Sequence, residues 1–156
     1  MNSISRALFI ASGVLWMVIG VLTPLLMGKV GPPIVFASPR TDTALFGQEP
    51  DALLDANRPL AIYRVMAWRT IAGLLLAVGA FTIGVAWFGL RPPTAWALGL
   101  LTFVGLAVLP YWDITFAPYR DAGVPLGIFD IPPLMWVPGV LMPGASVLGW
   151  IDYAAA

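Results

Sequence analysis

Four long uncharged runs limit what this chain can fold into. Once a Pro-Pro turn is set aside, the runs cover residues 7–28, 70–90, 94–112 and 131–151, and charged residues delimit them. Each run holds about 19–22 residues, which is about 29–33 Å of helix at 1.5 Å per residue, and the hydrocarbon core of a bilayer is about 30 Å thick. Four segments of this one length predict four transmembrane helices.

The composition agrees with an apolar solvent. Hydrophobic residues make up 60% of the 156 residues and charged residues only 10%, whereas a soluble domain carries roughly 25% charged residues. The sequence therefore predicts an all-α integral membrane protein. We expect a four-transmembrane-helix bundle that forms a single domain over residues 1–156, with a long structured loop between the first two membrane helices.

Arginine and tryptophan residues mark the expected edges of the membrane. Arg69 and Arg91 enclose one run, so each guanidinium can extend outward to a headgroup layer. Tryptophans gather at the same two levels, as is typical of interfacial aromatic residues; they are Trp87, Trp96 and Trp150 at one level and Trp68 and Trp112 at the other. Trp16 lies midway along the first run, where we expect it to pack between helices, with stacking on a hydrophobic ligand as the alternative.

Four crossings would place both termini on one side of the membrane and two connections on the other side. These connections, residues 29–63 and 113–130, form what we call the loop face. Within the first connection, "EPDALLDAN" predicts a short helix with Pro50 in its first turn. The segment "PPIVFA" is typical of a short strand or an extended segment.

The distribution of positive charge favours a cytoplasmic loop face. Six Lys and Arg residues lie on the loop face: Lys29, Arg40, Arg58, Arg64, Arg69 and Arg120. Only Arg6 and Arg91 lie on the terminal side, and cytoplasmic loops carry the excess of positive residues. The expected location is the bacterial inner membrane.

A candidate polar cluster lies where the predicted helices meet the loop face. It consists of Arg64, Arg69, Asp113 and Asp130, with Lys29 at the same level. The favoured interpretation is a set of interhelical ion pairs that sets the register of the bundle. The alternative is a functional site in which the two carboxylates act as acids and the two guanidiniums bind an anion.

Small residues form a stripe along the second run. Gly73, Ala77, Ala80 and Gly84 share one helix face. Such a stripe lets two membrane helices approach closely, so it is our candidate for helix packing.

The residue types exclude much of cofactor chemistry. The chain has no cysteine and no histidine, so a thiolate or imidazole ligand and an imidazole base are absent. Glu49, Asp51 and Asp55 are more typical of a solvated loop than of a cation site. We expect no catalytic residue, metal or cofactor, although a bound lipid is compatible with the sequence, and dispersed basic residues argue against nucleic acid.

The favoured functional hypothesis is a non-catalytic accessory or structural subunit of a larger membrane protein complex. Its partners would be other membrane subunits, further copies of itself and membrane lipids. The alternative is a lipid- or isoprenoid-binding protein or enzyme that uses the polar cluster as an interfacial pocket. A small transporter or channel ranks third, because the first run has no charged residue.

Overall fold

The computed structural model describes residues 3–27, 34–92, 94–131 and 133–155, and the regular structure in these ranges is helical. The α-helices are α1 (Ser3–Met27), α2 (Pro39–Phe46), α3 (Pro50–Ala56), α4 (Arg58–Gly84), α5 (Ala95–Asp121) and α6 (Pro133–Ala154). A π-helical turn, η1 (Val85–Gly89), continues α4, and a 3-10 turn, η2 (Ile128–Asp130), precedes α6.

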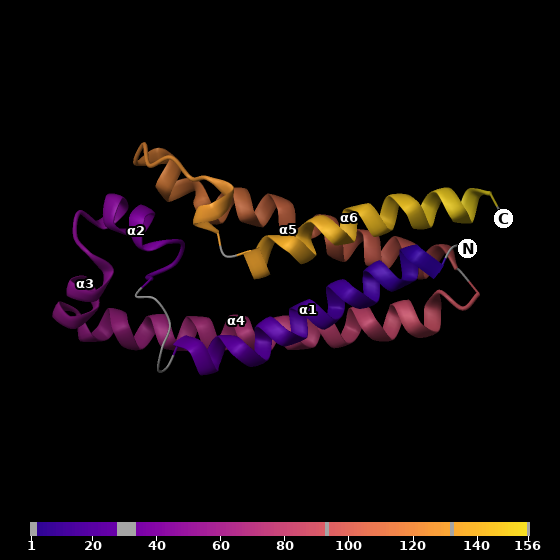
Figure 1. Ribbon diagram of the computed structural model, residues 1–156, viewed down its shortest axis with the longest axis horizontal. Coiled ribbons are helices and arrows are strands. Elements are labelled where there is room, and N and C mark those ends of the chain that lie inside the picture. The colour runs from indigo at the N-terminus through magenta and orange to yellow at the C-terminus, as the bar shows by residue number, and fades with distance from the viewer. Residues whose placement is uncertain (1–2, 28–33, 93, 132, 156) are drawn as a thin grey trace.

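Three of these helices are long and apolar enough to cross a membrane. They are Ile4–Leu26 within α1, Arg58–Gly89 across α4 and η1, and Ala95–Asp121 in α5. The 22-residue helix α6 covers the fourth predicted run and packs against α1 and α5. In Figure 1 the start of α1 and the end of α6 lie at one end of the molecule, and α2 and α3 lie at the other.

Glycines bring α1 and α4 into direct backbone contact. A Cβ atom added to Gly13 would lie 2.8 Å from the carbonyl oxygen of Gly79, and one added to Gly79 would lie 2.5 Å from that of Gly13. A Cβ atom added to Gly20 would likewise lie 2.7 Å from the carbonyl oxygen of Ala72. No side chain larger than hydrogen fits at these three glycines unless the helices separate, so α1 and α4 pack directly backbone to backbone.

The stripe that packs α4 on α1 is therefore not the predicted one. Of the predicted residues, Gly73, Ala77 and Ala80 are exposed, and a Cβ atom added to Gly73 or Gly84 would meet nothing within 4 Å. The packed stripe is one residue out of phase and contains Ala72, Gly79 and Ala86. Small residues occupy two adjacent faces of α4, and only the inner face matches the glycines of α1.

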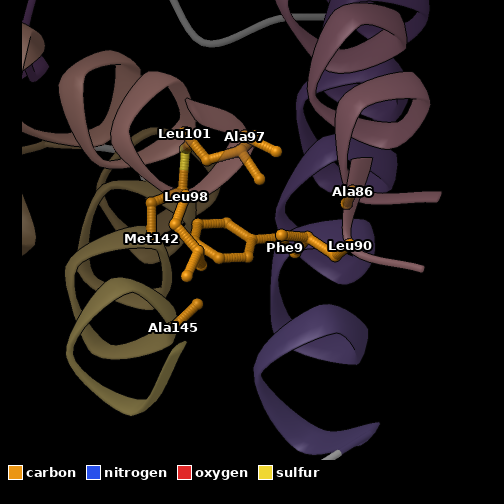
Figure 2. Close-up of a cluster of buried hydrophobic side chains, with 8 residues drawn as sticks. All are labelled: Phe9, Ala86, Leu90, Ala97, Leu98, Leu101, Met142 and Ala145. Carbon is orange, nitrogen blue, oxygen red and sulfur yellow. The ribbon is translucent and has the colours of Figure 1, made fainter. Parts of the chain in front are cut away.

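A cluster of buried apolar side chains joins α1 to α5 and α6. Figure 2 shows the ring of Phe9 from α1 pointing toward Leu98 and Met142, with Ala86 and Leu90 on its other side. All five residues are buried. The side chain of Ser5 also donates a hydrogen bond of 2.8 Å to the carbonyl oxygen of Ala145, which ties α1 to α6 near the terminal end.

The helices α4 and α5 extend beyond the predicted membrane runs. With η1, the α4 helix contains 32 residues, which is about 48 Å. The helices continue because charged residues end an apolar run without breaking a helix. The side chain of Asn57 caps the N-terminus of α4 by accepting a hydrogen bond of 3.2 Å from the Leu60 N–H. Helix α5 likewise continues to Asp121.

We expect Gly79→Ala to destabilise the protein and Gly73→Ala to leave it unchanged or slightly stabilised. The methyl group at residue 79 would collide with the backbone of α1, a cost of about 1–3 kcal/mol for overpacking. The methyl group at residue 73 meets open space. Unfolding of the two variants in detergent micelles measures the difference, and equal stability would contradict the observed packing.

Candidate functional site

The loop-face subdomain consists of residues 34–57 with α2 and α3, the ends of α4 and α5 that lie closest to them, and residues 122–131. Its apolar core contains Ala37, Tyr119 and Val124. The ring of Phe36 stacks on Trp68 of α4 with centroids 6.0 Å apart and meets Phe116 of α5 edge-on at 5.9 Å. An aromatic residue from the first connection therefore bridges the two long helices.

Asp42 of α2 organises the chain around it. Its buried carboxylate accepts hydrogen bonds from the backbone N–H groups of Val35 at 2.6 Å, Phe36 at 3.0 Å and Ala37 at 3.2 Å. The hydroxyl of Tyr119 on α5 donates a fourth hydrogen bond at 2.6 Å. One carboxylate thus shapes the segment before α2 and fastens it to α5.

Positive charge from α4 faces this carboxylate. The Arg64 side chain is attracted electrostatically by Asp42 and Asp51. The carboxylate oxygens of Asp42 are already occupied by donors, so Asp42 serves the fold of the subdomain.

Asp130 makes a second connection between the two parts of the loop face. Its Oδ2 accepts from the Arg40 guanidinium at 2.8 Å and from the Gly127 N–H at 2.7 Å, and its Oδ1 accepts from the Ser38 hydroxyl at 3.0 Å. Burial by itself raises the pKa of Asp130, but these hydrogen bonds and the charge of Arg40 outweigh it, so the pKa lies below its ordinary value. The Asp130 carboxylate thus binds Ser38 and Arg40, which precede it by 92 and 90 positions.

The structure distributes the predicted polar cluster over separate partners. Asp130 pairs with Arg40. Asp113 pairs with Arg120 on the same helix, in an exposed ion pair. Arg64 faces Asp42, as described above, and Arg69 is exposed on α4. Lys29 lies outside the described residues.

The sequence analysis did not predict α2. It also missed the hydrogen bond from Tyr119 to Asp42 and those from Ser38 and Arg40 to Asp130. A signal for this helix is present in "SPRT", because Ser38 is the N-cap, Pro39 occupies the first turn and Thr41 completes a capping box. The role of Asp42 has no comparable local signal, because Tyr119 is 77 positions away. The predicted short helix is confirmed at Pro50–Ala56. Of the segment predicted as a strand or an extended segment, residues 35–37 form bends, and residues 32 and 33 lie outside the described residues.

Two hollows flank the segment Val124–Pro125. The larger, of about 440 Å³, is lined by Phe116, Arg120 and Leu126. The smaller, of about 140 Å³, is lined by Arg40, Thr41 and Ala44. Both are mainly apolar with one guanidinium each, and each of these guanidiniums is engaged by an aspartate. Among the described residues no group of three acids is placed to hold a metal ion.

Comparison with known proteins does not assign this chain to a family. No protein-family model matches the chain, and neither the curated proteins nor the solved structures contain a significant match.

We expect Asp42→Ala to loosen the loop-face subdomain while the long helices persist. The substitution leaves three backbone N–H groups and the Tyr119 hydroxyl without their acceptor, and each orphaned buried donor costs about 1–3 kcal/mol. Hydrogen exchange should accelerate at residues 35–37 well before it does in α1. Asp55→Asn, at an exposed position, is the control, and equal exchange in both variants would refute this role.

We expect the contribution of Asp130 to stability to be present at neutral pH and lost on acidification. Its pKa in the folded protein is lowered, so its stabilisation is present above the unfolded pKa of about 3.9 and disappears as pH falls through the folded value. Asp130→Asn should therefore be less stable than the wild type at pH 7, by about 1–3 kcal/mol. The gap should narrow at acid pH in thermal unfolding experiments, and a gap that is constant with pH would contradict the assignment.

Proposed function

We propose that this protein is a non-catalytic four-span subunit of a larger membrane complex, with the outer face of α4 as its contact surface. The observation that carries the proposal is the unpacked stripe Gly73, Ala77, Ala80 and Gly84. Three of these residues are exposed, and among the described residues no other element comes within 4 Å of a Cβ atom added to either glycine. The stripe is defined by those four residues and is called the outer stripe.

The chemistry of helix association in lipid supports this use of the outer stripe. Lipid tails are as apolar as leucine, so membrane helices associate through close packing, for which small residues are enriched at interfaces. The inner face of α4 packs on α1 in this manner through Gly79. Larger exposed side chains, Leu74, Phe81 and Phe88, recur every seven residues and form one row beside the outer stripe, so a partner helix on the stripe could also pack against this row.

The loop-face subdomain supports a structural role. Asp42 and Asp130 are both buried and satisfied by donors from within the chain. Carboxylates that complete the fold in this way are not presented to a substrate. In the proposed arrangement the subdomain is a preformed platform on the cytoplasmic side of a bacterial inner membrane, α6 is the fourth span, and both termini lie on the opposite side.

Lipid or isoprenoid binding is the second candidate. The larger hollow beside Val124 combines the apolar side chains of Phe116 and Leu126 with the guanidinium of Arg120, a combination that suits an amphiphile with an anionic head. The ion pair between Arg120 and Asp113 would have to open for that head, so the hollow ranks below the outer stripe.

Mild extraction from the native membrane tests the subunit proposal. We expect mass spectrometry to find the wild-type chain in a particle heavier than its own 16.7 kDa, together with other membrane proteins or further copies of itself. Ala77→Leu combined with Ala80→Leu should release it by filling the outer stripe. Val140→Leu, at an exposed site on α6, is the control. A free monomer in every preparation would refute the proposal.

A further inference from the structure

A cavity of about 160 Å³ lies inside the helical bundle, apart from the loop face and the outer stripe. Its lining comes from all four long helices and consists of Trp16, Leu75, Val78, Val104, Gly105, Gly139 and Met142. The cavity exists because α4 packs on α1 while α5 packs on α6, and few contacts join α4 directly to α5. Gly105 closes one wall, since a Cβ atom added there would lie 2.9 Å from the Cβ atom of Met142.

The lining of this cavity is almost wholly apolar. Among the described residues that line it none is charged, and the indole nitrogen of Trp16 is covered by neighbouring atoms. An apolar cavity of this kind stays dry, because a water molecule there would lack hydrogen-bond partners. The surface inside the bundle therefore suits a hydrocarbon.

The cavity opens between α4 and α5. Leu75 and Val78 on α4 and Val104 on α5 are partly exposed, whereas Trp16 and Met142 at the opposite wall are buried. Few contacts between α4 and α5 close this side. Both helices are long and apolar enough to cross a membrane, so lipid tails would surround the opening.

The lining residues also indicate the depth of the cavity. Trp16, Val78, Gly105 and Met142 each lie near the middle of one of the four apolar runs. Because each run matches the thickness of the hydrocarbon core, the cavity lies close to the midplane of the bilayer. The groups found at that depth are the methyl ends of acyl chains.

The size of the cavity limits its occupant. An engineered apolar cavity of about 150 Å³ binds benzene, so this cavity has room for about six carbon atoms. Left empty, the space would deprive its lining of dispersion contacts. We propose that the cavity binds the methyl end of one phospholipid acyl chain, which enters between α4 and α5 and supplies the packing that these two helices do not give each other.

Nuclear Overhauser measurements on the full chain in phospholipid nanodiscs test the proposal, with protonated methionine methyl groups in an otherwise deuterated protein. Met142 is only 1% exposed, so its methyl group meets lipid protons only where a chain enters the cavity. We expect cross-peaks from this methyl group, assigned with Met142→Leu, to acyl-chain protons and none to headgroup protons. Deuteration of about the last six carbon atoms of the chains should remove these cross-peaks, and deuteration next to the ester should leave them.

Val78→Phe should remove the Met142 cross-peaks by filling the cavity, and Val104→Phe, from the other side of the opening, replaces it if that variant does not fold. Val147→Phe, at an exposed position on α6, should keep them. Met17 lines an exposed hollow on α1, so its methyl group should show acyl-chain cross-peaks in every variant. Met142 cross-peaks that are absent beside those of Met17, that survive deuteration of the chain ends, or that persist in a folded cavity-filling variant would each overturn the proposal.

Discussion

The contact between α1 and α4 at Gly13 and Gly79 determines where the other helices lie. Because two backbones meet there without side chains between them, α4 is held along α1 and leaves the other side of α1 for α6. The ring of Phe9 then fills the space between α1, α5 and α6. Helix α5 packs on α6 and η1 and hardly on α4, which leaves the interior cavity beside Trp16. Close packing of α4 on α1 thus leaves few direct contacts between α4 and α5.

The loop face is organised by a different interaction, the pairing of buried carboxylates with donors. Asp42 satisfies three backbone N–H groups that lie outside any helix, and Asp130 satisfies one more. Both also accept from the other connection, through Tyr119 and Arg40 respectively. A segment with little regular structure is therefore fixed in shape, because leaving these groups unpaired would cost more than ordering the chain. The loop face therefore combines an aromatic core with buried polar pairing.

Two features of this molecule support the proposed role as a subunit. The acids that looked available in the sequence are either engaged within the fold, as Asp130 is, or paired on the surface, as Asp113 is. The outer stripe of α4 is exposed and apolar, and its small residues permit close approach of another helix.

The amino-acid pattern by itself determined the all-helical character and the approximate place of the long apolar helices, because run length and charge depend only on local sequence. It also identified α3 through Pro50 and the buried position of Trp16. It could not decide which face of α4 packs on α1, because Gly73 and Gly79 are equally small and only the partner's glycines distinguish them. The contacts of Asp130 with Ser38 and Arg40, and of Asp42 with Tyr119, were likewise decided by tertiary structure. These donors come from distant parts of the chain that meet only when the long helices extend past the apolar runs.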